Sequence, residues 1–246
     1  MKQYLQIKEQ NQDAILFFRL GDFYEMFFED AQLVSKELEL VLTGKSCGLS
    51  ERAPMCGIPY HAASGYIARL IEKGYKVAIC EQVEDPKKAK GLVKREVVRI
   101  VTPGTTLDTM SLDESKNNYL MSIVSIGDHF GCAIADITTG DCYVTEIDEE
   151  RKLWDEINKF LPAEIICNDA FLLSGVDVAD LKGRLGICVF ALDPWYFDDQ
   201  LCQKTLKEHF HVGNLEGLGI GDYDSGIIAS GALFLYLKET QKTALS

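Results

Sequence analysis

The sequence predicts a mixed α/β protein of two domains, and three features indicate this. Short apolar runs typical of buried strands alternate with amphipathic runs typical of helices. The segment 103–118 is polar and contains Pro and Gly, a composition typical of a linker. Three closely spaced strand-like runs follow it, and helices and strands then alternate. With 246 residues, 47% of them hydrophobic, the chain is long enough to bury a sizeable core in each domain.

We place the first domain at residues 1–106, the linker at 107–118 and the second domain at 119–246. In the first domain we expect a mixed sheet surrounded by helices. Its predicted elements are a polar helix over 2–11, a strand over 14–19, a helix over 23–38, strands over 38–42 and 54–58, a helix over 62–73, and strands over 75–82 and 97–101.

In the second domain, strand-like runs separated by short turns predict an antiparallel meander, and α/β units come after it. The predicted elements are strands over 118–125, 130–136 and 141–146, a helix over 149–160, strands over 163–168 and 186–191, and helices over 198–209 and 224–240. The glycine-rich stretch 213–221 lacks the spacing of a nucleotide-binding loop and is expected to be a flexible connection. The last helical run has no finished cap, so we expect the chain to be part of a longer protein.

The turn formed by residues 21–25, with the sequence GDFYE, admits two interpretations. In the first, Asp22 and Glu25 form a capping box at the start of a helix, and Phe23 is buried core. In the second, Phe23 is exposed and inserts into stacked bases, while Glu25 forms a hydrogen bond with a base edge. The two interpretations differ in whether these side chains point into the protein or out of it.

The charge of the chain is unevenly distributed. The net charge is −13, which argues against nucleic acid as a partner at first sight. Residues 1–106, however, carry 15 Lys and Arg against 14 Asp and Glu, whereas residues 107–246 carry 10 against 24. Any surface that faces DNA is therefore expected in the first part, and the second part should face away from it.

One basic cluster stands out in this acidic chain. It consists of Lys87, Lys88, Lys90, Lys94, Arg95 and Arg99. A run of charges is usually a solvated face, but this cluster shares a domain with the turn at 21–25, so we interpret it as a set of contacts to phosphates. Lys45 follows Gly44 in a loop, and the pair resembles the tail of a P-loop. Because Glu39 stands where that motif needs its first Gly, we expect no nucleotide site there, although Lys45 can reach a phosphate.

Other chemistry is weakly indicated. The eight Cys residues form no C-x-x-C pair, so we expect buried, reduced thiols of a cytosolic protein and no zinc site. His61 has no partner at ligand spacing, which favours a role at a helix start over catalysis or metal binding. Asp136 lies on a predicted strand without an evident partner set, which favours a structural role over metal-dependent catalysis. The sequence contains no apolar run long enough for a membrane span.

Four segments, in this order and spacing, resemble the mismatch-recognition domain of the MutS family of DNA mismatch repair proteins. They are FFRLGDFYEMF at 17–27, PMCGIPYH at 54–61, VAICEQ at 77–82 and VVRIVTPGT at 97–105. Weaker matches, DITTG at 136–140 and PAEI at 162–165, extend the resemblance over nearly the whole chain.

The resemblance implies a mismatch-recognition domain followed by an RNase H-like connector domain. It implies that Phe23 and Glu25 probe the mismatch and that Arg95 contacts phosphate. It places a basic contact near Lys45, although the family usually has a Lys-Arg pair where this chain has Gly44-Lys45. Lys94 is expected to contact the DNA backbone as part of the basic cluster. No catalytic residue and no metal ligand is expected.

The partners that the resemblance implies are double-stranded DNA with a mismatch or a small loop, a MutL-like repair protein on the connector domain, and a second copy in a homodimer. ATP and magnesium would bind an ATPase domain outside this chain, which contains no complete P-loop, so we expect no cofactor and no ATP hydrolysis here. A bacterial, cytoplasmic, nucleoid-associated location follows. Two alternatives are a catalytic RNase H-like nuclease and an acidic protein-interaction module that does not bind DNA.

Overall fold

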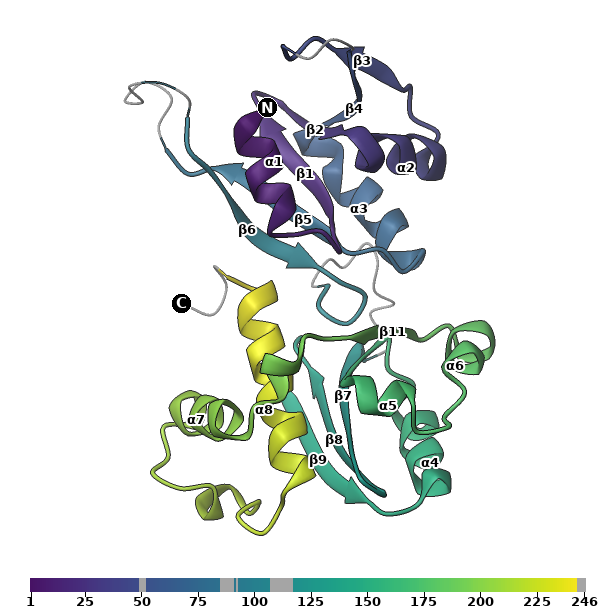
Figure 1. Cartoon of the computed structure of the whole chain (residues 1–246), viewed down its shortest axis with the longest axis vertical. Helices are drawn as coiled ribbons and strands as arrows, with labels where there is room; N and C mark the ends of the chain where they lie inside the picture. Colours follow the sequence, from purple (N-terminus) through teal and green to yellow (C-terminus); the bar gives the residue numbers. More distant parts are fainter. Residues whose placement is uncertain (49–51, 85–90, 92, 107–116, 243–246) are drawn as a thin grey trace. The chain divides into compact units, whose positions relative to one another are not determined.

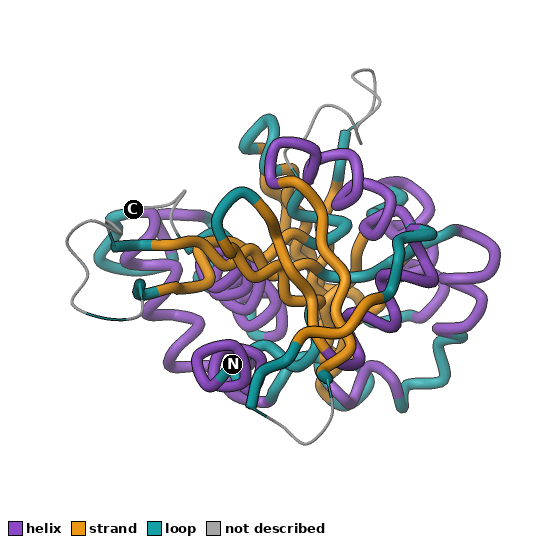
Figure 2. Tube along the Cα trace, turned by 90° about the horizontal axis from the view of Figure 1, so that it is seen from above, coloured by secondary structure: helices purple, strands orange, loops and turns teal. Residues whose placement is uncertain are grey.

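A computed structural model describes residues 1–246 except 49–51, 85–90, 92, 107–116 and 243–246. The chain divides into two compact units, one formed by residues 1–113 with 240–246 and the other by residues 114–239. Each unit is a sheet with helices packed against it (Figures 1 and 2). Most of the predicted linker 107–118 lies outside the described residues.

The first unit is built on a mixed sheet with the strand order β3-β4-β2-β1-β5-β6 in the described residues. Strands β1 and β5 are parallel, and the other neighbours are antiparallel. The strands are β1 (Ile15–Leu20), β2 (Phe23–Phe27), β3 (Thr43–Lys45), β4 (Ala53–Pro59), β5 (Val77–Gln82) and β6 (Arg95–Val101). The helical elements are α1 (Lys2–Glu9), α2 (Phe28–Leu38), the 3₁₀ turn η1 (Tyr60–Ala62) and α3 (Ala63–Glu72).

Both faces of this sheet carry packed side chains, because successive residues of a strand point to opposite faces. On one face, Tyr24 and Met26 of β2 are buried with apolar residues of α2 and α3. On the other face, Phe27 of β2 is buried against Tyr4 of α1 and Phe18 of β1. Phe23 and Glu25 share the face of Phe27.

The predicted helix over 23–38 is wrong in its first five residues, which form strand β2. Residues Gly21 and Asp22 make a tight turn between β1 and β2, and Gly21 adopts the positive φ of 59° that such a turn favours. The capping box is therefore absent, because α2 begins only at Phe28 and has no side-chain cap. The first four residues of FYEMF alternate between exposed or partly exposed and buried, which is the period of a strand, and Phe27 is buried on the second face.

The predicted strand over 38–42 is also wrong. Helix α2 continues to Leu38 and ends at Glu39, which adopts a left-handed conformation with φ of 57°. The chain then runs without regular structure to β3, which includes Gly44 and Lys45 of the segment expected to be a loop. The other predicted elements of this unit are confirmed, with small differences at their ends.

The second unit has a sheet with the strand order β11-β10-β7-β8-β9 in the described residues. The predicted antiparallel meander is confirmed as β7 (Tyr119–Ile126), β8 (His129–Asp136) and β9 (Asp141–Ile147). Strands β10 (Glu164–Cys167) and β11 (Cys188–Ala191) extend it in parallel with β7. The helices are α4 (Glu150–Phe160), α5 (Asp169–Leu172), α6 (Val178–Leu185), α7 (Asp199–Phe210) and α8 (Ser225–Thr240), of which α5 and α6 were not predicted.

Helices cover both faces of this second sheet. Apolar residues of α4, α5 and α6 pack on one face, and those of α7 and α8 pack on the other. The stretch 213–221 is not merely a flexible connection, because Leu215 and Ile220 are buried against α7 and α8. No helix among the described residues has the length and apolar character that crossing a bilayer requires.

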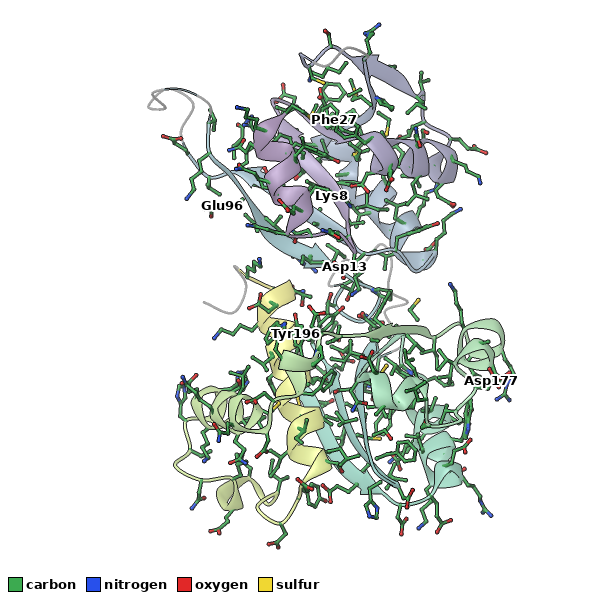
Figure 3. All side chains as sticks on the ribbon, viewed as in Figure 1. Lys8, Asp13, Phe27, Glu96, Asp177 and Tyr196 are labelled. Atoms are coloured by element: carbon green, nitrogen blue, oxygen red, sulfur yellow. The ribbon has the colours of Figure 1, made fainter. Side chains whose placement is uncertain are left out.

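A buried carboxylate ties the first helix of unit one to its sheet. Asp30 of α2 accepts a hydrogen bond from the Leu16 N–H at 2.9 Å and forms an ion pair with Lys8 of α1 at 3.0 Å. The Lys8 ammonium also donates to the Ala14 carbonyl at 2.7 Å. Lys8 is labelled on α1 in Figure 3. Asp30 thus joins three segments that are distant in sequence.

Replacing this carboxylate should therefore destabilise the unit. Asp30→Ala leaves the Leu16 N–H without its acceptor and the partly buried Lys8 ammonium without its counter-charge, so we expect the free energy of unfolding to fall by about 2–3 kcal/mol. Urea unfolding monitored by circular dichroism measures the change. Asp148→Ala, which breaks the exposed pair with Lys152, is the control and should change stability by less than about 0.5 kcal/mol. Equal effects of the two variants would contradict the structural role of Asp30.

Candidate functional site

The aromatic ring of Phe23 is exposed at the end of the β1–β2 hairpin. Phe23 is the first residue of β2 and pairs with Leu20 of β1 and Pro59 of β4. It retains 47% of its accessible surface, whereas the neighbouring residues Tyr24 and Met26 are buried. The interpretation of Phe23 as buried core is therefore wrong. The residue presents an apolar ring to the outside from a sheet that holds its backbone on both sides.

Glu25 lies beside Phe23 on the same face of the sheet. Two residues separate them along β2, so their side chains point the same way. Glu25 pairs with Gly57 of β4, which has no side chain to fill the space between them. A Cβ atom at Gly57 would lie 3.6 Å from Glu25 Cγ and 3.8 Å from Phe23 Cδ1. The Phe23 ring and the Glu25 carboxylate therefore lie beside the backbone of Gly57, which carries no side chain of its own.

Lys45 reaches the same place from β3. Its ammonium lies 2.6 Å from Glu25 Oε2, and the two side chains retain 41% and 17% of their accessible surface. The ammonium is also 5.7 Å from the centre of the Phe27 ring, which is labelled in Figure 3. The structure thus brings together three of the predicted site residues, Phe23, Glu25 and Lys45.

Arg95 is held within the first unit. Its Nε donates to the Arg19 carbonyl at 2.7 Å, and its Nη1 donates to Gln3 Oε1 at 3.1 Å and to the Val93 carbonyl at 2.9 Å. Its guanidinium lies 5.2 Å from the centre of the Phe18 ring, and burial lowers the pKa of Arg95 from its ordinary value. Arg95 therefore fastens β6 to β1 and α1, and only Nη2 forms no hydrogen bond with a described residue.

Lys94 differs from Arg95 because it is exposed. Its ammonium pairs with Glu96 at 2.6 Å, and this hydrogen bond raises the pKa of Lys94 (Glu96 is labelled in Figure 3). Arg99 donates to the Thr105 carbonyl at 3.0 Å and is half-buried. Lys87, Lys88 and Lys90 lie outside the described residues. Among the described members of the basic cluster, Lys94 is thus the one with an open path to a phosphate.

A set of contacts that the sequence did not reveal supports the Phe23 turn from the opposite face. The Arg19 guanidinium lies 3.8 Å from the centre of the Tyr60 ring and 3.6 Å from Glu81. Tyr24 donates its hydroxyl proton to Glu81, and the Tyr60 N–H donates to the Asp22 carbonyl at 2.9 Å. These contacts hold the turn that carries Phe23. Tyr60 is itself 45% exposed and follows Pro59, the strand partner of Phe23. In the sequence, its place in the segment PMCGIPYH was the signal that could have linked Tyr60 to the site.

The residues considered for catalysis have structural roles. Asp136 is fully buried, and its carboxylate accepts hydrogen bonds from the N–H groups of Asn118 and Thr138 and from the Thr138 hydroxyl. His61 lies in η1 just before α3, and its ring contacts Tyr60 edge-on. In the part of the chain that the structure describes, no group of three or more His, Cys, Asp or Glu side chains is placed to hold a metal ion.

Comparison with known proteins identifies relatives over the full chain. The family model described as MutS domain I matches residues 1–110, and that described as MutS domain II matches residues 118–246. A protein named DNA mismatch repair protein MutS from Lachnoclostridium phytofermentans is 63% identical over 246 residues, which are all of this chain and 26% of that protein. Proteins of the same name from Ruminiclostridium cellulolyticum and Alkaliphilus metalliredigens are 55% and 51% identical, and the chain covers 28% of each. The chain therefore spans about a quarter of the length of these curated relatives.

The contacts of Arg95 predict that its removal affects stability. Arg95→Ala removes donors to three oxygen atoms and the packing on Phe18, so we expect the free energy of unfolding to fall by about 1–3 kcal/mol. Chemical denaturation of the chain measures the change. Lys94→Ala removes an exposed cation two positions from its partner and should leave stability within about 0.5 kcal/mol. If Arg95→Ala lowered the free energy of unfolding no more than Lys94→Ala does, the hydrogen bonds of the Arg95 guanidinium would not stabilise the unit.

Proposed function

The chain belongs to the MutS family of DNA mismatch repair proteins, and we propose that its first unit recognises mispaired or unpaired bases in duplex DNA. The observation that carries this proposal is the exposure of Phe23 beside Glu25 on a rigid strand. An exposed aromatic ring flanked by a hydrogen-bonding group can test both the stacking and the pairing of a base. The nuclease alternative has no support, because the Asp136 carboxylate accepts hydrogen bonds from the N–H and the hydroxyl of Thr138 in the turn that follows its strand.

Phe23 would insert its ring at the mispaired step and stack on a base. Stacking on an aromatic side chain contributes about 1–3 kcal/mol per base, and unstacking a step costs a few kcal/mol. These two terms nearly cancel, so the balance depends on how easily the step opens. A mismatched step opens and bends at lower cost than a paired one. The wedge therefore discriminates through the deformability of the DNA as well as through direct contact.

Glu25 would accept a hydrogen bond from the edge of the base that Phe23 displaces. A carboxylate is repelled by phosphates, so its presence at a DNA surface calls for a specific hydrogen bond in return. Gly57 carries no side chain beside Glu25 and Phe23, so β4 covers neither group at this position. The pair would thus reject binding that depends on phosphate contacts alone.

Lys45, Lys94 and Arg95 would contribute the contacts to the DNA backbone. The exposed ammonium groups of Lys45 and Lys94 suit this role. Arg95 would add at most its Nη2 group, because its other nitrogen atoms already donate within the protein. Such contacts position the duplex without reading its sequence.

The second unit would act as a connector that relays the bound state. Residues 107–246 carry 10 Lys and Arg against 24 Asp and Glu, a balance that suits a protein partner better than DNA. We propose a MutL-like repair protein as that partner and a homodimer as the assembly in which the chain works. ATP and magnesium would act in regions outside this chain, and the protein would work in the bacterial cytoplasm on the nucleoid.

The wedge role predicts a selective loss when the ring is removed. Phe23→Ala should reduce the ratio of affinities for mismatched and matched duplexes by about 5- to 150-fold, because the lost stacking is worth about 1–3 kcal/mol. Fluorescence anisotropy with a G·T duplex and its G·C counterpart measures the ratio. The matched control is Tyr143→Ala, which removes a ring of similar exposure (48% against 47%) from the second unit. An unchanged ratio for Phe23→Ala would refute the wedge.

The carboxylate makes a separate prediction. Glu25→Gln leaves the Lys45 cation without its counter-charge, which favours phosphate contacts, and weakens the hydrogen bond to the base. We therefore expect tighter binding to matched duplexes and a mismatch preference that falls severalfold. The same anisotropy titrations, repeated at several salt concentrations, give both quantities. If the preference were retained in full, the charge of Glu25 would have no special role.

A further inference from the structure

The carboxylate assigned to base recognition already has a partner within the protein. Glu25 Oε2 accepts a hydrogen bond from the Lys45 ammonium at 2.6 Å. Its other oxygen atom, Oε1, forms no hydrogen bond with any described residue. The lysine therefore occupies one side of the carboxylate and leaves the other side available.

The contact requires Lys45 to extend across a neighbouring strand. Strand β4 separates β3 from β2, and Lys45 pairs with Ala53 whereas Glu25 pairs with Gly57. Ala53 and Gly57 are four residues apart on β4, so their partners share one face of the sheet. The Lys45 ammonium that reaches Glu25 lies 5.7 Å from the centre of the Phe27 ring. Three strands thus have to be in register for the pair to form.

The pair changes what the site presents to DNA. Glu25 alone would place a negative charge, on a side chain with 17% of its surface accessible, beside the Phe23 wedge. Paired with Lys45, the two groups are neutral together, and the repulsion between the carboxylate and the phosphates is cancelled at its source. A lysine that served only as a phosphate contact would act independently of Glu25.

We propose that Lys45 is a positioning residue for mismatch recognition, which neutralises Glu25 and holds its Oε2 so that Oε1 faces the base. This inference rests on the proposed function, since it assigns a second residue to the same site. It makes the effects of Lys45 and Glu25 interdependent. Removing the lysine should be harmful mainly while the carboxylate is present.

A double-mutant cycle tests this dependence. The chain is measured alone and in place of the matching 26% of the Lachnoclostridium phytofermentans relative, with mismatched and matched duplexes. Lys45→Met should weaken mismatch binding about tenfold in the presence of Glu25, because an uncompensated carboxylate then faces the phosphates. In the E25Q background, the same change should cost only about twofold, the share of a simple phosphate contact. Equal losses in both backgrounds would overturn the proposal.

Two further variants separate positioning from a general effect of charge or folding. Lys45→Arg keeps the cation and should retain most of the mismatch preference. Lys73→Met breaks a matched pair with Glu37, which has a similar distance of 2.7 Å and similar exposure (45% and 21%), and its effect should not depend on Glu25. Thermal unfolding of each variant shows whether it folds. If Lys45→Met fails to fold, Lys45→Gln replaces it in the cycle.

The wedge variant distinguishes failure of this inference from failure of the proposed function. If Phe23→Ala leaves the mismatch preference unchanged, the proposed function itself is wrong. If Phe23→Ala abolishes the preference while the losses on removing Lys45 are equal with and without Glu25, only the interdependence is wrong.

Discussion

The pairing of β2 with β1 on one side and β4 on the other is the constraint on which the candidate site depends. A strand held on both sides cannot rotate, so alternate side chains are committed to opposite faces. Burial of Tyr24 and Met26 on one face therefore places Phe23 and Glu25 on the other face, where Phe27 is buried, Glu25 is partly exposed and Phe23 is exposed. The packing of Tyr24, Met26 and Phe27 thus fixes the direction in which Phe23 and Glu25 point.

Four described cations that we consider as phosphate contacts from the sequence fall into two groups, which the sequence does not distinguish. Arg95 and Arg99 direct their guanidinium groups to carbonyl oxygen atoms within the unit. Lys45 and Lys94 expose their ammonium groups and pair with single carboxylates. The planar, multiply donating guanidinium suits internal fastening, whereas the flexible lysine stem lets its charge move to a new partner.

The sequence predicted the meander and most helices, because their hydrophobic periods are regular and their turns carry Gly. It failed at β2, since FYEMF leads into α2 without a turn and the spacing of Asp22 and Glu25 imitates a capping box. Phe23 and Glu25 were named as site residues by resemblance rather than by pattern. The Lys45–Glu25 contact could not be predicted, because it depends on the register of three strands.

The direct junction between β2 and α2 has a mechanical consequence. Phe27 ends the strand and Phe28, with a φ of 54°, begins the helix, so no compliant loop separates them. A force applied at Phe23, the first residue of β2, is therefore transmitted along a strand that is hydrogen-bonded on both sides and into helix α2. Phe23, the side chain proposed to insert between bases, lies at one end of β2, and the other end of this strand joins a helix packed in the interior of the unit.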